Sequence, residues 1–538
     1  MSLCLADDVA DFHDVDLINT PPSARLPLSV DSGIFRFTHS RLKQIILSML
    51  WQRKWCSTGL IGIAVVLLIC SSSSCRRSQP AGGLFKLHSC RLPEIKEELL
   101  CGKFRVFENR RTRSGRTIDL NIVVLPAFDQ KTKAEPLFDL AGGPGVASTA
   151  AATFYATEGK ECRQRRDVVL VDQRGTGNSN RLSIPQEKTP ESDLREMYPV
   201  DYVMRMRDAL RQHADLTQYT TSIAMDDLDD VRAWLGYDRI NLFGLSYGTR
   251  AALVYLRQHP EHVRTITLVG VAPTYLRMPM YHAQAAKRGM NLLLAQCEHD
   301  AKCREAFPQI RDDWMKVLAD LQAAPARVQY DPSGDKAAPV TVEIQRDVFA
   351  EKIRNFLYGR DKASQIPLIV HEAANGNFAP FLRQAIGPSI PDMIADGMYL
   401  CVTCAEDVPF IDQAEAAKLN ADNPFGNYRV VQQTWACGMW PHGDIPGDFR
   451  EPVRSSVPAL IFSGNFDPVT PPQRGDEVAR RLSNSRHVIV PQAAHGIDGL
   501  TDAACIDKII LEFIEKADAK DLDVSCVDRM APPPFATK

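Results

Sequence analysis

From about residue 80, short apolar runs alternate with amphipathic stretches along the chain. Residues 167–171 (DVVLV) are nearly all apolar, as expected for a strand buried on both faces of a sheet. Residues 223–235 instead place their apolar side chains on one side of a helix. This alternation is typical of a parallel sheet with helices on both faces, so the pattern predicts the α/β class. Four aspartates of the helix are expected on its solvated face rather than at a metal: Asp226, Asp227, Asp229 and Asp230.

The alternation stops for a long central stretch and then resumes. Strand-like runs return only at residues 458–462 and 487–490, and the stretch before them has mostly helical spacing. We expect residues 81–275 and 451–538 to form one α/β core. Residues 276–450 would be a large, mainly helical lid, inserted before the last strands and lying over the strand ends.

The N-terminal part of the chain is expected to lie outside this fold. An apolar run at residues 59–70 follows Arg53 and Lys54 and is itself followed by four serines. The run is too short to span a bilayer comfortably. A basic flank, a short apolar core and a small-residue exit are features of a secretory signal. The pattern therefore predicts an exported protein, with a signal anchor as the alternative.

The start of the chain is a separate question. We assign residues 1–80 to an N-terminal extension and signal peptide. Translation from Met49 would give a signal of ordinary shape, which makes residues 1–48 an upstream extension. Cys70 or Cys75 could carry a lipid, although the residues before each are poor matches for that processing. Contact with a membrane is expected only through such a lipid or a signal anchor.

Composition and charge exclude little. The 538 residues are 45% hydrophobic and 24% charged, as in ordinary globular proteins. A formal net charge of -3 shows no electrostatic preference for nucleic acid or anionic membranes. No nucleic-acid partner is therefore expected, and the oligomeric state is left open.

The cysteines agree with export. Of the 14, four (Cys4, Cys56, Cys70 and Cys75) lie in the leader, which leaves ten in the body. An even number in an exported chain is compatible with disulfides. The C-x-x-C at residues 401–404 has no second such motif beside it, so it is interpreted as structural and not as a metal site. The expected pairs are Cys90/Cys101, Cys297/Cys303, Cys505/Cys526 and Cys404/Cys437, with Cys162 and Cys401 left over.

A G-x-S-x-G motif occupies residues 244–248, with Ser246 at its centre. A strand-like run at residues 239–243 precedes it, and a helical stretch at residues 249–258 follows. A G-x-S-x-G between a strand and a helix is the nucleophile elbow of α/β-hydrolases, whose small residues allow the sharp turn that exposes the serine. Ser246 is therefore the candidate nucleophile.

A serine nucleophile needs a base, and the base needs an acid that orients it. In this fold the acid and then the histidine follow the serine, on loops after the last strands. Asp467 follows the strand-like run at residues 458–462, and His495 follows the one at 487–490. The sequence predicts a triad of Ser246, Asp467 and His495.

Two backbone N–H groups should face the negative charge that develops on the substrate oxygen. One is expected from Tyr247, directly after the nucleophile. The other is expected from the glycine-rich loop at residues 141–145, because glycine lets the backbone approach a substrate closely. Gly143 is the first choice for this donor and Gly142 the second.

Three stretches together give the chain a wider resemblance. Gly142–Gly145 reads GGPG, residues 172–179 read DQRGTGNS, and residues 463–472 read SGNFDPVTPP. On these motifs the chain, from about Cys90 to its C-terminus, resembles the proline iminopeptidase and tripeptidyl aminopeptidase family of α/β-hydrolases. Proline iminopeptidases have histidine before GGPG, where this chain has Ala141, which favours the exported tripeptidyl aminopeptidase-like branch.

The resemblance implies removal of short units from the free N-terminus of peptide substrates, without metal or cofactor. It also implies a lid group that binds the substrate α-ammonium, and Glu406, beside Cys404, is the candidate. An esterase or other small-acyl hydrolase is the alternative, since fold does not determine substrate. A non-catalytic binding protein on the same scaffold is a remote third.

Overall fold

The computed structural model describes residues 87–186, 188–331, 339–387 and 393–538. These residues all belong to the unit that runs from Gln79 to Lys538. The expected extension and signal peptide, with Met49, Cys70 and Cys75, lies outside the described residues.

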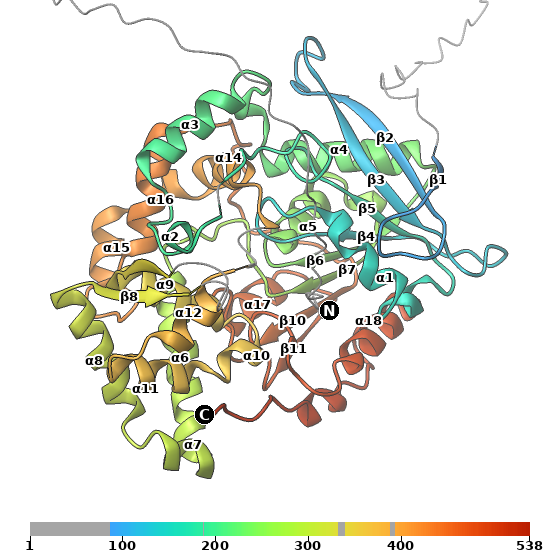
Figure 1. Ribbon diagram of the computed structural model, residues 1–538. Coiled ribbons are helices and arrows are strands. Elements are labelled where there is room, and N and C mark those ends of the chain that lie inside the picture. Colours follow the sequence, from blue (N-terminus) through green and yellow to red (C-terminus); the bar gives the residue numbers. More distant parts are fainter. Residues whose placement is uncertain (1–86, 187, 332–338, 388–392) are drawn as a thin grey trace, which may run out of the picture. The chain divides into compact units, whose positions relative to one another are not determined.

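A nine-stranded sheet lies at the centre of the described chain, with strand order β1-β2-β3-β5-β4-β6-β7-β10-β11 (Figure 1). The pairs from β1 to β5 are antiparallel, and every pair from β5 onward to β11 is parallel. The prediction of a mostly parallel α/β sheet is therefore confirmed. The strands are β1 (His88–Cys90), β2 (Leu99–Phe107), β3 (Thr117–Leu125), β4 (Leu137–Leu140), β5 (Val168–Val171), β6 (Ile240–Leu245), β7 (Val263–Val269), β10 (Ala459–Gly464) and β11 (Ser485–Val490).

Helices cover both faces of the sheet. In β5, Val169 belongs to one hydrophobic core and Leu170 to the other, which explains why the strand is apolar on both sides. The first core includes Leu228 of α4 and Val254 of α5, and the second includes Phe513 of α18. The helices concerned are α4 (Thr221–Trp234) and α5 (Tyr247–Gln258) on one face, with α1 (Ala152–Ala156) and α18 (Ala504–Lys516) on the other.

The chain between β7 and β10, the expected lid, is largely helical. Much of it has a core of its own, in which the ring of Trp314 lies near those of Phe349 and Phe425. One departure from the expected helical lid is the hairpin of β8 (Ala326–Tyr330) and β9 (Val340–Ile344). The lid helices are α6 (His282–His299), α7 (Ala301–Ala306), α8 (Ile310–Ala323), α9 (Arg346–Phe356), α10 (Arg360–Ala363), α11 (Ile366–Ala374), α12 (Ala379–Ala385), α14 (Asp396–Glu406), α15 (Gln413–Asn420) and α16 (Tyr428–Met439).

The last lid helices join the core on the α4/α5 face of the sheet. Leu400 of α14 and Val430 of α16 belong to the same core as Val203 of α3 (Val200–Leu210), which precedes β6. Figure 1 shows α3, α14 and α16 side by side. The other helices are α2 (Pro190–Asp193) and α17 (Pro472–Ala479), with short 3-10 turns η1 (Ser148–Ala151), η2 (Lys160–Arg163), η3 (Leu216–Gln218), η4 (Pro260–His262), η6 (Val408–Phe410) and η7 (Ser525–Arg529). Within the described ranges, no helix has the length and apolar character needed to cross a membrane.

All four expected disulfides are present. Cys404–Cys437 joins α14 to α16, and Cys297–Cys303 joins α6 to α7. The other two pairs, Cys90–Cys101 and Cys505–Cys526, tie β1 to β2 and α18 to η7. Cys162 and Cys401, which the expected pairing left over, are buried free thiols.

Candidate active site

Ser246 lies in a sharp turn between β6 and α5. Its backbone has φ 56° and ψ -121°, a conformation that non-glycine residues rarely adopt. A Cβ on Gly248 would lie 1.9 Å from the Leu140 carbonyl oxygen, and one on Gly244 would lie 2.4 Å from that of Gly248. Both positions therefore exclude side chains, which is the physical reason for glycine on each side of the serine.

Asp467 and His495 meet on the loops after β10 and β11. His495 Nδ1 donates to Asp467 Oδ2 at 2.9 Å, and the Asp467 side chain is fully buried. The backbone N–H groups of Val469 and Thr470 donate to its other oxygen at 2.7 and 2.8 Å. Burial alone would raise the pKa of Asp467, but the charge and hydrogen bond of His495 and these two amides hold it below its ordinary value. Asp467 is thus set to remain an anion that orients the imidazole.

Ser246 and His495 lie at the same edge of the sheet, on either side of the end of β7. The N–H of Ser246 donates to the Val269 carbonyl, and a Cβ on the next residue, Gly270, would lie 3.2 Å from His495 Cε1. Among the described residues, Ser246 Oγ and the His495 ring do not form a hydrogen bond. Such contacts are often long without substrate and tighten when it binds. The structure therefore brings the three expected residues to one strand edge, with the acid–base pair already formed.

The glycine-rich loop after β4 lies against the nucleophile. A Cβ on Gly142 would be 3.3 Å from Ser246 Cβ, and Gly143 has φ +108°. Neither the Gly142 nor the Gly143 N–H donates a hydrogen bond to any other described residue. Tyr247 is the first residue of α5, where N–H groups have no partner within the helix. These N–H groups are available for a substrate oxygen, and the choice of Gly143 with Tyr247 stays a prediction.

The DQRGTGNS stretch braces the loops behind the nucleophile. Asp172 accepts from the N–H and hydroxyl of Thr149, just after the glycine-rich loop. Arg174 is buried and donates to both carboxylate oxygens of Asp227 at 2.6 and 3.0 Å. The expectation that Asp227 lies on a solvated helix face was therefore wrong. Asp227 is only 2% exposed. Its burial is tolerated because its charge is paired with that of the buried Arg174, which is distant in the sequence.

Glu406 lies at the end of α14 and is enclosed inside the protein. Its side chain is 0% exposed, and its two oxygens accept from the N–H and hydroxyl of Thr221 at 2.7 and 2.8 Å. Arg250 lies 3.6 Å away and pairs more closely with Asp407. Both oxygens are already used at the start of α4, so the structure argues against Glu406 as the acceptor of a substrate ammonium. Thr221 also contacts the Tyr247 hydroxyl, which places Glu406 behind the nucleophile elbow.

We expect Glu406→Gln to reduce the pH dependence of stability. Burial raises the pKa of Glu406 to about 7, although Arg250 and Thr221 act in the opposite direction. A carboxyl with a raised pKa in the folded state adds stability that is complete below its unfolded pKa of about 4.5 and is lost as pH rises to about 7. The free energy of unfolding should therefore fall across this window by up to about 1.4 kcal/mol per pH unit.

Urea unfolding of both proteins between about pH 4.5 and 7.5 measures this contribution as the difference between their slopes. Glu343→Gln removes a carboxylate from the exposed hairpin strand β9 and should keep the parental slope. Equal slopes in the parent and Glu406→Gln would show that Glu406 does not titrate in this range.

A set of lid residues beside His495 carries no motif, and the sequence interpretation did not identify them. The Tyr358 carbonyl accepts from the backbone N–H of His495 at 3.0 Å, and their rings meet edge-on with centroids 5.0 Å apart. Arg354 donates to the Tyr358 hydroxyl at 3.0 Å. Only the folded lid brings these residues to the candidate base.

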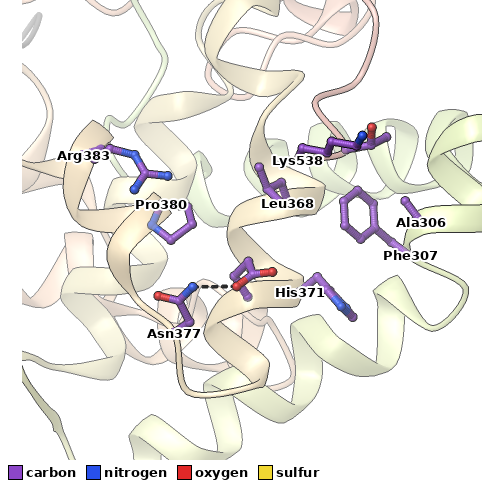
Figure 2. A pocket seen from close by; sticks show the side chains of 10 residues that line it. Ala306, Phe307, Leu368, His371, Asn377, Pro380, Arg383 and Lys538 are labelled. Atoms are coloured by element: carbon purple, nitrogen blue, oxygen red, sulfur yellow. Dashed lines mark hydrogen bonds between the residues drawn. The ribbon is translucent and has the colours of Figure 1, made fainter.

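A separate pocket of about 400 Å³ lies in the lid near the C-terminus (Figure 2). Phe307, Leu368, His371 and Arg383 line it, together with the last residue, Lys538. None of Ser246, Asp467 and His495 lines this pocket. We therefore assign it no part in catalysis.

One group of potential metal ligands occurs in the described chain, away from the strand ends that carry the triad. Oxygen and nitrogen atoms of Asp229, His259 and His262 lie within 4.8 Å of one another. The two histidines have the i, i+3 spacing that the sequence interpretation overlooked. Asp229 already accepts from Arg232 at 2.6 Å and is hydrogen bonded to His262 at 2.8 Å. The guanidinium neutralises Asp229, so the group is explained by contacts within the protein.

Comparison with known proteins indicates the same fold. Residues 140–299 match the model described as alpha/beta hydrolase fold, and residues 421–526 match the one described as TAP-like protein. The tripeptidyl aminopeptidase of Streptomyces coelicolor is 23% identical over 430 residues, covering 73% of this chain and 76% of that protein. Serine protease Hip1 of Mycobacterium tuberculosis is 23% identical over 512 residues, covering 85% and 94%. A solved proline iminopeptidase from Mycobacterium smegmatis has 18% identity and a TM-score of 0.35, covering 74% of this chain and 96% of that one.

The chain therefore has the α/β-hydrolase fold, its residues 421–526 are similar to the TAP-like model, and it is a serine hydrolase. The family resemblance expected from the GGPG, DQRGTGNS and SGNFDPVTPP stretches is confirmed at this level.

Proposed function

We propose that this chain is an exported serine aminopeptidase that removes N-terminal residues or short peptides from peptide substrates. The observation that carries the proposal is the Asp467–His495 hydrogen bond at the strand edge where Ser246 occupies a nucleophile elbow. The relatives named tripeptidyl aminopeptidase and serine protease support a peptide as the substrate. Four disulfides within the described chain support export, because disulfides persist mainly in oxidising compartments.

In the proposed reaction, His495 takes the proton of Ser246 Oγ while that oxygen attacks the substrate carbonyl carbon. The N–H groups of Tyr247 and Gly143 hold the resulting oxyanion. His495 then gives its proton to the leaving amine, the C–N bond breaks, and an acyl-enzyme on Ser246 remains. Water, deprotonated by His495, attacks the ester and releases the N-terminal fragment as an acid. The proposal includes no metal or cofactor, since side chains and backbone amides supply each step.

An esterase or other small-acyl hydrolase is the second candidate. The internal contacts of Glu406 favour it, because the residue expected to bind a substrate ammonium is already engaged by Thr221. The same triad chemistry would then act on an ester.

A substrate panel tests the proposed function. Aminoacyl, dipeptidyl and tripeptidyl amides are compared with free and with acetylated N-termini, and simple esters are included. We expect the free-amine peptides to exceed their acetylated forms in kcat/KM by about tenfold or more, the effect of losing one charged hydrogen bond. Equal rates for both forms, or turnover of esters alone, would reject the aminopeptidase.

A further inference from the structure

A largely enclosed polar cluster in the lid reaches His495 through Tyr358. Tyr358 holds the His495 backbone, and its hydroxyl accepts from Arg354 at 3.0 Å. Arg354 in turn donates twice to Glu351, at 2.6 and 2.9 Å, and Arg429 from α16 donates to the same carboxylate at 2.7 Å. A continuous set of contacts thus joins the candidate base to two guanidinium groups.

The charges of this cluster do not balance. Neither Arg354 nor Arg429 forms an ion pair with any described carboxylate besides Glu351. Burial would raise the pKa of Glu351, but the two guanidinium groups lower it to about 2, so Glu351 stays ionised. Two positive groups therefore share one negative group, and one positive charge is left over. The Arg354 side chain is 2% exposed and that of Arg429 is 18% exposed, so water compensates this charge only in part. Proteins seldom bury an uncompensated charge, because its desolvation is not repaid.

His282, the first residue of α6, adds an unused polar side chain within electrostatic reach of both arginines. It is 5% exposed, and neither ring nitrogen has a hydrogen-bond partner among the described residues. Burial lowers its pKa well below the usual range, and the charges of Arg429, Arg354 and His495 act in the same direction. The ring is therefore neutral near pH 7 and lies within electrostatic reach of both the cluster and the candidate base. Buried polar groups without partners are rare, and such a group needs an explanation.

We propose that Arg429, Arg354 and His282 form a subsite beside His495 for a carboxylate of the substrate. A carboxylate would supply the missing negative charge, and guanidinium groups bind carboxylates in charged hydrogen bonds. Arg429 has two N–H groups to spare, because three of its five donate within the described chain, to Gln433, Glu351 and Tyr399. The neutral His282 ring can donate one further hydrogen bond to the carboxylate.

The same charges disfavour a substrate ammonium at this place. An ammonium would meet the excess positive charge, and Glu351 already accepts from both arginines. The subsite rests on the proposed peptide substrate and narrows it to peptides that carry a carboxylate near the scissile bond. Two sources are open: an acidic side chain on the acyl part, or the C-terminal carboxylate of a short leaving part.

Matched substrate pairs test the subsite and separate its two sources. The first set places Glu or Gln in turn at each of the three positions before the scissile bond. The second set ends the leaving part in a free carboxylate or in an amide. We expect one set to contain a pair whose carboxylate member is better by about tenfold to 100-fold in kcat/KM, the range for one charged hydrogen bond. Arg429→Gln and His282→Asn should each reduce the ratio of kcat/KM between the carboxylate substrate and its neutral partner, and Arg429→Gln should bring this ratio below about twofold. The kcat/KM of the neutral substrates should fall less.

The controls distinguish a loss of carboxylate binding from misfolding of a variant and from an error in the proposed substrate class. Arg327→Gln changes an arginine that is 77% exposed on the β8–β9 hairpin and should keep the parental ratio. The rate at which an uncharged fluorophosphonate labels the active serine shows whether each variant is folded, and a misfolded Arg429 variant leaves His282→Asn to decide. A parent without any pair above about twofold, or ratios unchanged in both variants, overturns the subsite. If only esters are hydrolysed, the aminopeptidase proposal is rejected. The subsite is then tested alone with half-esters of dicarboxylic acids, each compared with the same ester in which the free carboxylate is converted to an amide.

Discussion

Ser246→Ala is expected to remove hydrolysis of every substrate, peptide or ester, while the protein stays folded. Loss of the nucleophile of a triad lowers kcat by about 10⁶-fold, because the acyl-enzyme can no longer form. Alanine fits the turn, since the hydroxyl makes no hydrogen bond to the described residues that holds the elbow closed. Turnover of the best peptide and the best ester, together with fluorophosphonate labelling, measures the loss.

A second serine in this chain provides a matched control. Ser463 Oγ lies 2.8 Å from His487 Nε2, and His487 Nδ1 lies 2.8 Å from an oxygen of Asp476. Ser463→Ala should therefore retain labelling and turnover close to the parent. Activity that survives in Ser246→Ala, or disappears in Ser463→Ala, would show that Ser246 is not the nucleophile.

The two serine–histidine–aspartate sets show that hydrogen-bond distances alone do not define a catalytic triad. Ser463 belongs to strand β10 and is 1% exposed, so no substrate carbonyl can reach it. Ser246 instead lies at the end of a strand, at the start of a helix whose first N–H groups are free. The turn, rather than the contact distances, makes Ser246 the better nucleophile.

Most of the core and the triad could be predicted because their signals are local. Each strand of the parallel part is a short apolar run, and each residue of the expected triad lies on the turn or loop after such a run. In this fold the ends of the parallel strands meet at one edge, so order along the chain was enough to bring Ser246, Asp467 and His495 together. The four disulfides were predictable for the same reason, since the partners of three of them are close in the sequence.

The lid was predictable only as a helical insertion. The β8–β9 hairpin interrupts the helices of the lid. The polar residues of the lid form hydrogen bonds and ion pairs with residues distant in the sequence, and such pairs leave no periodic pattern along the chain. Asp227 was expected in solvent, but it pairs with Arg174, and Glu406 was expected in a pocket, but it binds Thr221. His282 and Arg429 come from helices almost 150 residues apart, and no spacing in the sequence relates them.

Asp467→Asn is expected to lower kcat/KM by about 10⁴-fold at neutral pH, the loss seen when the acid of a triad becomes an amide. The carboxylate accepts from His495 Nδ1 and so leaves the basic lone pair on Nε2, toward the nucleophile. An amide N–H₂ turned toward Nδ1 would donate to it and favour the opposite tautomer, in which Nε2 carries the proton and cannot take one from Ser246. The Val469 and Thr470 N–H groups would still find the amide oxygen, so the loop should keep its shape.

Asp476→Asn is the matched control, because it makes the same change in the second aspartate–histidine pair. It should leave kcat/KM close to the parental value. The two variants should also differ in pattern, since a tautomer effect lowers kcat and leaves substrate affinity largely unchanged. A fall in both variants, or an increase in KM alone for Asp467→Asn, would mean that Asp467 supports the loop and does not orient His495. A fall in kcat confined to Asp467→Asn would instead identify Asp467, on the loop after β10, as the triad residue that orients His495. The order of motifs along the chain predicts the same assignment.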